Sequence, residues 1–207
     1  MTFLELSRKL RQYCGGSGTG PASVVDQVGE NALWVQWVNQ AYLEIQNERY
    51  NWSWRWAEAS QAVAIGQAVH DTLGSRIDLA TVYLDDSLLR CLDYREFRFD
   101  YKMLKAGVVT AFSVRPDHKL VFNAIPESAG TLTYEYYKDA ELMSANDDVP
   151  LIPERFQDLV IYKAMMLYAG YENAPEVYQN GMSHYEHMLA NMSAEQLPAM
   201  SFAGPLA

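Results

Sequence analysis

The stretch NDDVPLIPERFQDLVIYKAMMLYAGYENAPEVYQNGMSHYEHMLANM, residues 146–192, decides how this chain folds. Pro150 and Pro153 bracket a rigid loop that follows an acidic turn and leads into a long apolar segment. A second break, at the tripeptide NAP, separates that segment from a polar one that carries tyrosines and methionines. The pattern predicts two helices, over about residues 153–170 and 175–192, packed as an antiparallel hairpin. Such a pair offers surface for packing against copies of itself and carries no arrangement of reactive groups.

Upstream, the sequence predicts two more helices joined by a glycine-rich connector. Thr2 is a capping residue for a short helix over residues 3–13. The connector CGGSGTGPAS, residues 14–23, follows, and a strongly amphipathic helix then runs from about Glu30 to Arg49. Apolar side chains recur along that helix every three or four residues and define its buried face: Leu33, Trp34, Trp37, Val38, Ala41, Tyr42 and Ile45.

From Glu58 the pattern changes to the alternation typical of β-strands. The clearest strand is Thr131–Tyr137, which consists almost entirely of residues that favour strands. One helix, Tyr94–Lys105, is expected among the strands, and the RPDHK turn is expected to join two of them as a hairpin. The shorter strands are expected at residues 62–65, 76–82, 108–114 and 119–122.

Together these patterns predict an α+β, mainly α fold: a helical bundle formed by the N- and C-terminal helices, with a small antiparallel β-rich insertion. The 207 residues suit a single domain of this kind. The expected divisions are residues 1–57 and 150–195 for the bundle, 58–149 for the insertion with its one helix, and 196–207 for an extended C-terminal tail. The tail is small, apolar and proline-containing, so it would become ordered on a partner.

The composition is that of a globular protein, with 49% hydrophobic and 20% charged residues. The formal net charge is −10, and residues 139–207 hold only two basic residues against ten acidic ones. Tight DNA binding requires clustered Lys and Arg to neutralise phosphates, so this balance argues against a high-affinity DNA-binding protein. It is compatible with DNA that slides past without specific binding.

The start of the chain and its cysteines indicate where the protein works. Cys14 and Cys91 lie far apart without metal-ligand spacing, which favours a reducing compartment and no disulfide framework. The first ten residues lack the basic and apolar regions of a signal peptide. No apolar run approaches the ~20 residues of a membrane span. We therefore expect a cytosolic protein or a member of an assembled complex, without a membrane partner.

Several motifs resemble catalytic sites only superficially. The glycine connector is not a phosphate-binding loop, because no lysine follows it and no strand precedes it. His184 and His187 lie three residues apart on a predicted helix, but a metal site needs a third ligand, so a solvated or intersubunit face is favoured. The acidic pairs at 85–86 and 147–148 are expected in turns or as helix caps. With no GxSxG, HExxH or CxxC motif, we expect no catalysis, no cofactor and no metal.

One predicted helix carries a run of cations. Their spacing of three or four residues would place them in one basic stripe that meets an acidic partner or passing DNA. An ordinary solvated helix, in which acidic residues alternate with the cations, is an equally good interpretation. The stripe consists of Arg95, Arg98, Lys102 and Lys105.

The segment NWSWRW, residues 51–56, places three tryptophans within five residues. They could stack on the bases of single-stranded nucleic acid. Because no basic groove surrounds them, core packing or a subunit interface is favoured. Fourteen tyrosines and nine methionines support the same interpretation, since both residue types fill large contact surfaces. The subunit-interface candidates are Trp52, Trp54, Trp56, Tyr178 and Tyr185.

Several of these segments form a pattern along most of the chain: Tyr94–Arg98, the Arg115–Asp117 hairpin, Tyr134–Lys138, and Asp148–Phe156 with the helix pair beyond it. In this pattern the chain resembles the head-to-tail adaptor (connector) proteins of tailed bacteriophages. The most specific element is the D-x-P-x-x-P-x-x-F entry, which is followed by the helix that bears alanines and tyrosines.

The resemblance implies a helical bundle with a β-rich insertion, assembled as a dodecameric ring beneath the portal of the filled head. Such rings extend the DNA channel and carry the next neck or tail protein. The protein would therefore be located in the virion neck after assembly in the host cytoplasm. The C-terminal segment of such adaptors commonly reaches the portal, which maps the portal contacts to Leu197, Pro198, Met200, Phe202 and Leu206.

Two alternatives remain at this point. One is another neck component, a stopper or tail-completion protein, which would bind a second ring and not the portal directly. The other is a nucleic-acid-processing accessory factor that uses the tryptophans and the basic stripe. A shift of labelled DNA at ~150 mM salt would support that factor, whereas the acidic balance predicts no shift.

Overall fold

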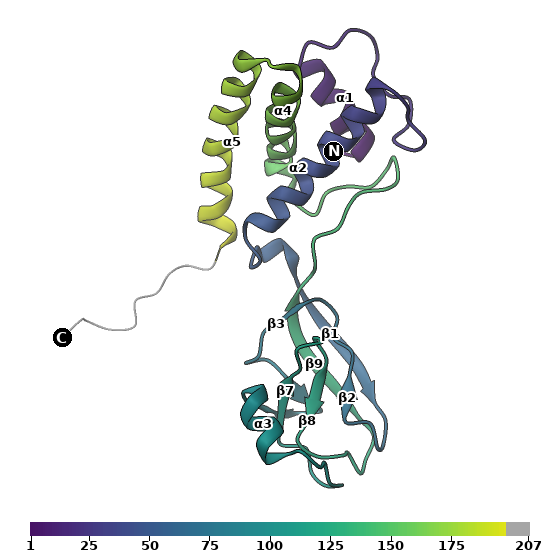
Figure 1. The fold of residues 1–207 in the computed structure, drawn as a ribbon, viewed down its shortest axis with the longest axis vertical. Helices are drawn as coiled ribbons and strands as arrows, with labels where there is room; N and C mark the ends of the chain where they lie inside the picture. The colour runs from purple at the N-terminus through teal and green to yellow at the C-terminus, as the bar shows by residue number, and fades with distance from the viewer. Residues whose placement is uncertain (198–207) are drawn as a thin grey trace, which may run out of the picture. The chain divides into compact units, whose positions relative to one another are not determined.

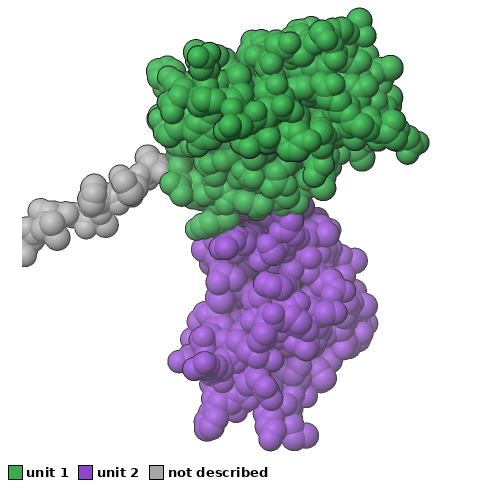
Figure 2. Space-filling model, turned by 45° about the horizontal axis from the view of Figure 1, so that its top comes forward, with its two compact units in different colours: residues 1–54, 140–207 green, residues 55–139 purple. Residues whose placement is uncertain are grey.

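The computed structural model describes residues 1–197, and its fold is α+β and mainly α, as the sequence predicts. The chain forms two compact units (Figure 2). Within the described residues, the helical unit contains Met1–Trp54 and residues 140–197, and the inserted unit contains Arg55–Asp139. The insertion is therefore shorter than the expected 58–149, because residues 140–149 pack with the helices. No helix within residues 1–197 is long and apolar enough to cross a membrane.

The helical unit is built from four α-helices (Figure 1). The first helix has the predicted bounds, and the second ends one residue earlier than predicted. The apolar helix after the proline loop begins at Asp158 and not at 153, because Pro153 is followed by a short 3-10 helix, Glu154–Phe156. The four helices are α1 (Phe3–Tyr13), α2 (Glu30–Glu48), α4 (Asp158–Glu172) and α5 (Pro175–Gln196).

The start of α1 is held from both sides. Thr2 caps the helix: its hydroxyl accepts from the backbone N–H of Glu5, whose carboxylate accepts from the N–H of Thr2. The next free N–H group, that of Phe3, donates to the carbonyl of Asp148 at 2.7 Å. Because unpaired N–H groups at a helix start are costly to bury, the loop before α4 completes the cap of α1.

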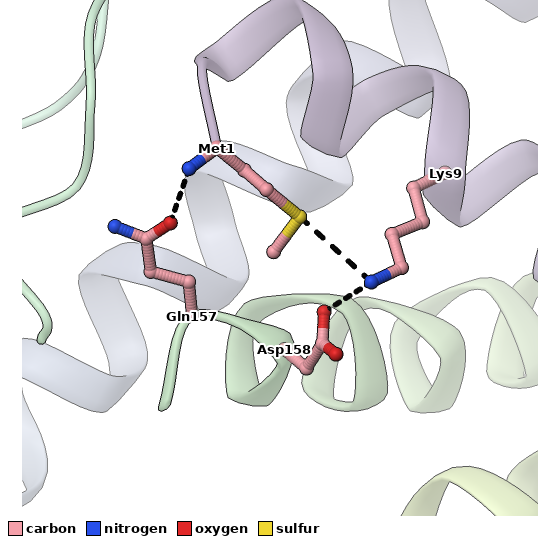
Figure 3. A network of polar contacts seen from close by, with 4 residues as sticks. All are labelled: Met1, Lys9, Gln157 and Asp158. Carbon is pink, nitrogen blue, oxygen red and sulfur yellow. Dashed lines mark hydrogen bonds and ion pairs between the residues drawn. The ribbon is translucent and has the colours of Figure 1, made fainter. Parts of the chain in front are cut away.

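Side chains also join α1 to α4 (Figure 3). The ammonium of Lys9 lies 2.5 Å from a carboxylate oxygen of Asp158, and the amino group of Met1 donates to Oε1 of Gln157 at the same distance. Partial burial lowers the pKa of Lys9, but the hydrogen bond and charge of Asp158 outweigh it and raise the pKa above its ordinary value. A carboxylate in the first turn of α4 also interacts favourably with the helix dipole.

The return segment, residues 140–149, has no helix or strand, and its backbone is satisfied by amide side chains of α2. Nδ2 of Asn39 donates to the carbonyl of Met143 at 2.8 Å, and Oδ1 of Asn39 accepts from the N–H of Met143 at 3.0 Å. Gln46 bonds Glu141 in the same two-way manner, at 2.8 and 3.2 Å. Two amides, two turns apart on α2, thus hold an extended segment as a neighbouring strand would.

Helices α4 and α5 form the predicted antiparallel hairpin. Asn173 ends α4 in the left-handed conformation, with φ 54°, which asparagine tolerates better than most residues. The two helices approach closely at Gly181, where a Cβ atom would lie 2.9 Å from the carbonyl oxygen of Tyr162. The largest fully buried side chains of the helical core are Phe3, Leu6, Leu10, Trp34, Tyr42, Ile45 and Trp52.

The inserted unit contains two small sheets. In the first, the long strands β1 and β9 pair antiparallel, with Trp56 opposite Tyr137 and Val63 opposite Gly130. Three two-residue strands complete this sheet: β3 (Arg76–Ile77), β4 (Tyr83–Leu84) and β5 (Ser87–Leu88). The two long strands are β1 (Trp56–Val63) and β9 (Gly130–Tyr137).

The second sheet has the strand order β2-β8-β7-β6. The predicted RPDHK hairpin joins β7 to β8, and the N–H of Arg115 donates to the carbonyl of Lys119. One pair, β6 with β7, is parallel, so the insertion is mostly and not wholly antiparallel. The strands are β2 (Val69–His70), β6 (Arg90–Cys91), β7 (Ala111–Val114) and β8 (Leu120–Phe122).

The two sheets share one core, in which the alternate side chains of β1 and β9 that face inward meet the apolar residues of β7 and β8. The only α-helix of this unit, α3 (Tyr94–Asp100), lies against β7. The core residues with the least exposure are Val82, Phe112, Leu120, Phe122, Leu132 and Tyr134.

Candidate functional site

The histidines and acidic pairs serve local structure. His184 stacks on the ring of Tyr162, with centroids 5.0 Å apart, and Nε2 of His187 lies 3.3 Å from Nδ2 of Asn191. Within residues 1–197, no three His, Cys, Asp or Glu side chains gather in a way that could hold a metal ion. The helix face that carries the two histidines is solvent-exposed.

The two acidic pairs lie in turns. The carboxylate of Asp85, which has φ 51°, accepts from the N–H of Thr131 at 2.8 Å and fits against Gly130. Oδ2 of Asp148 accepts from the N–H groups of Ala145 and Ser144, and these backbone hydrogen bonds lower the pKa of Asp148. Both carboxylates therefore fix backbone conformation, as the sequence indicates for these pairs.

The three tryptophans of NWSWRW do not form a stacking platform. Trp52 is fully buried in the helical unit, where it stacks on the half-buried Trp54 with ring centroids 6.1 Å apart. Trp56 instead begins β1 of the inserted unit, is 45% exposed, and donates from Nε1 to a carboxylate oxygen of Glu135. Because Trp52 is buried, neither a neighbouring subunit nor a nucleic-acid base can contact it, so the tryptophans lose their main support as a stacking surface for bases.

The two candidate tyrosines of α5 also differ. Tyr178 is 37% exposed, so a neighbouring molecule can reach it. Tyr185 is buried, and its hydroxyl donates to Oε1 of Glu48 at 2.6 Å, while the ammonium of Lys163 lies over its ring. Burial, followed by the hydrogen bond and charge of Glu48, raises the pKa of Tyr185. Tyr185 therefore belongs to the core, and the candidates at the surface are Trp54, Trp56 and Tyr178.

The basic stripe is shorter than predicted. Helix α3 ends at Asp100, so Lys102 and Lys105 lie in the irregular segment beyond it and do not continue a helical face with Arg95 and Arg98. The helix ends because Tyr101, outside the helical region at φ −119° and ψ 38°, packs on Phe97. All four cations are exposed, and within residues 1–197 none of them has a carboxylate within ion-pair distance.

An aromatic cluster that the sequence analysis did not identify lies on the helical unit. Its rings extend from the buried Trp34 through Trp37 to Tyr171, which is 64% exposed. The centroids of neighbouring rings lie 5.0–5.5 Å apart. The signal was present as two pairs at three-residue spacing, one on each helix. The cluster consists of Trp34, Trp37, Tyr168 and Tyr171.

Carboxylates flank the aromatic cluster. Oε1 of Glu30 accepts from Nε1 of Trp34 at 3.2 Å. The pKa of Tyr168 is raised, first by burial and then by the negative charges of nearby groups that include Glu172 and Glu30. Both glutamates are exposed. The result is an electron-rich aromatic surface between two negative charges, which suits a cationic side chain.

The charges are divided unevenly between the two units. The helical unit holds six basic and 14 acidic residues, for a net charge of −8. The inserted unit holds ten basic and 12 acidic residues, for a net charge of −2. The insertion thus carries most of the cations, and the helices carry most of the negative charge.

Of the predicted portal contacts, only Leu197 belongs to the described part of the chain. It is half-buried and packs against the helical core just after α5 ends. The other four lie outside the described residues: Pro198, Met200, Phe202 and Leu206.

Comparison with known protein families gives a match over nearly the whole chain. A family model described as SU10 adaptor protein matches residues 1–206. No curated protein matches the chain.

Proposed function

The chain belongs to the SU10 adaptor protein family, a family of phage structural adaptors, and on this premise we propose that it forms a ring connecting the capsid portal to the tail. The ring extends the channel through which DNA passes, and the role requires no catalytic step. The observation that carries the proposal is the family match, which covers virtually the whole chain.

The exposed aromatic side chains support a ring. A subunit of a closed ring must offer two different surfaces, one for each neighbour. Aromatic residues and methionines are enriched at such contacts. The helical unit exposes Tyr171 and Tyr178, and the inserted unit exposes Trp56, Phe99 and Met103. Each unit therefore has apolar surface that a neighbouring copy would cover, and we propose twelve copies, as in the adaptors that the chain resembles.

The negative charge supports a channel that does not retain DNA. An acidic wall repels phosphates, so DNA passes without the contacts that would slow it. We propose that carboxylates of the helical unit, which carries the larger net charge of −8, face the lumen.

The portal contact is assigned to the C-terminal segment that begins at Leu197. Because Leu197 packs against the helical core, the residues that follow start from a fixed point. They contain three large apolar side chains, Met200, Phe202 and Leu206, which gain stability by burial on a partner. The opposite side of the ring would carry the next neck or tail protein, which places the chain in the virion neck.

The test is native mass spectrometry of the chain mixed with its portal, followed by imaging of the complex. The expected result is a ring of this chain bound directly to the portal. Monomers both alone and with the portal would refute the proposal, and binding only to a second ring would identify a stopper or tail-completion protein. A chain that ends at Leu197 should lose portal binding while its thermal unfolding stays unchanged.

A further inference from the structure

One face of α3 combines cations with an exposed aromatic ring. At about 100° per residue, Arg95, Arg98 and Phe99 project from one side of the helix, roughly opposite the buried Phe97. The carboxylates Glu96 and Asp100 project from another side, so they do not neutralise this face. We call Arg95, Arg98 and Phe99 the cationic face.

The exposure of this region is unusual for a soluble surface. Phe99 is 88% exposed and Met103 is 83% exposed, and both lie among cations without a partner in residues 1–197. Two large apolar side chains with this degree of exposure, four residues apart in the sequence, favour an interaction site. Because the charged groups around them are positive, the surface that covers them should be negative and apolar.

The helical unit has such a surface. The exposed end of the aromatic cluster, Trp37 and Tyr171, lies beside Glu172 and Glu30. A guanidinium stacks on an aromatic ring and also pairs with carboxylates, so arginine fits this site better than lysine does. The rings of Trp37 and Tyr171, whose centroids lie 5.5 Å apart, thus meet carboxylates at the surface of the helical unit.

We propose that the cationic face of one copy binds the exposed end of the aromatic cluster of the neighbouring copy. Arg95 and Arg98 lie against Trp37 and Tyr171 and pair with Glu30 and Glu172, while Phe99 extends the aromatic stack. The contact joins two different surfaces, so repeated copies form a closed ring when the rotation between them closes. The inference rests on the proposed function, because it names the surfaces that join ring neighbours.

The contact is tested by disulfide trapping between two chains, in a background with Cys14→Ala and Cys91→Ser. One chain carries Met103→Cys, next to the cationic face. The other carries Gln40→Cys, one helical turn from Trp37 on α2. Each chain has a single cysteine, so only contacts between molecules are trapped. The matched control replaces Met103→Cys by Leu79→Cys, an exposed position in the turn after β3.

The Met103→Cys and Gln40→Cys pair should give about tenfold more mixed dimer than the control pair, since a partly desolvated cation–aromatic contact contributes roughly 1–2 kcal/mol. Adding Arg95→Glu and Arg98→Glu to the first chain should lower the yield to that of the control. Adding Glu30→Arg and Glu172→Arg to the second chain should then restore part of it, because the ion pairs return without the cation–aromatic stacking. Thermal unfolding of each chain confirms that it is folded.

Two results would overturn the inference. One is a yield equal to that of the control, and the other is a yield that the Arg95→Glu and Arg98→Glu exchange leaves unchanged. If binding to labelled duplex DNA is lost on this exchange while trapping is unchanged, the cations bind DNA. If a ring still forms with the portal, either of these two results refutes the contact but not the proposed function. Trapping without a ring would refute the proposed function and retain the contact.

Discussion

Nε1 of Trp52 donates a hydrogen bond of 3.1 Å to the carbonyl oxygen of Ile45. Ile45 lies in the last turn of α2, where four carbonyls have no partner within the helix. Arg49, just past the helix, is extended, and its guanidinium donates to the carbonyl of Glu48 at 3.3 Å, not to that of Ile45. The buried indole of Trp52 therefore satisfies a carbonyl at the end of α2, a bond that a phenylalanine ring at this position could not make.

Replacing Trp52 by Phe should lower the free energy of unfolding by about 1–3 kcal/mol, because it leaves the carbonyl of Ile45 unpaired and opens a small cavity. Trp52→Ala should cost about 3–5 kcal/mol. Urea denaturation measures both changes. The control is Trp56→Phe, at an exposed position, which should change stability by less than about 0.5 kcal/mol. Equal effects at the two positions would contradict the assigned role of Trp52.

Asn39→Ala should destabilise the helical unit by about 2–3 kcal/mol, since the N–H and carbonyl of the buried Met143 both lose their partner. The return segment should then exchange its amide hydrogens faster in hydrogen-exchange mass spectrometry. The adjacent Gln40, which is exposed and bonds only Glu44, provides the matched control. Gln40→Ala should leave both the stability and the exchange of residues 140–149 unchanged.

Gly181→Ala should lower stability by about 1–3 kcal/mol, because the added methyl group would lie 2.9 Å from the carbonyl oxygen of Tyr162 and push α5 away from α4. On α4, a Cβ at Gly170 would meet nothing within 4 Å. Gly170→Ala should therefore raise stability by up to about 1 kcal/mol through helix propensity alone. Thermal unfolding of the two variants should shift in opposite directions, and a Gly181→Ala variant at least as stable as the parent would exclude close packing at Gly181.

The stability of the inserted unit should fall as the pH is lowered below the ordinary histidine pKa of 6.5. Burial lowers the pKa of His70, although its hydrogen bond with the carbonyl of Gln67 and the charge of Asp71 act in the opposite direction. The unfolded chain therefore takes up a proton at a higher pH than the folded chain, and this uptake favours unfolding. His70→Phe should flatten the difference in unfolding temperature between pH 7.5 and pH 5.5. An unchanged pH profile would show that His70 titrates normally.

The sequence predicts the elements whose stability is local. The helix predicted after the capping residue Thr2 has the bounds of α1, and the strand-favouring residues 131–137 identify most of β9. The break at Asn173 correctly separates α4 from α5. In each case the side chains that specify the element lie within it, so the pattern is visible in a single segment.

Where distant residues determine the conformation, the sequence is less informative. The cations after Asp100 follow helical spacing, but the chain leaves the helix and forms a bridge between Ala106 and Ile125. Residues 140–149 show no periodicity because their partners are the amides of Asn39 and Gln46. The aromatic cluster was missed for the same reason, since each helix supplies only half of the rings. Trp37 was expected on the buried face of its helix but is only half-buried.

The pairing of Trp56 with Tyr137 has an evolutionary consequence. Trp56 and Tyr137 lie next to the points where the chain leaves and re-enters the helical unit, and they face each other on one rung of an antiparallel ladder, so their Cα atoms are only about 5 Å apart. A two-residue turn can span such a gap, and so can a whole alternative domain with paired ends. An insertion attached at one point of the helical unit would let recombination lengthen, replace or delete it in one piece.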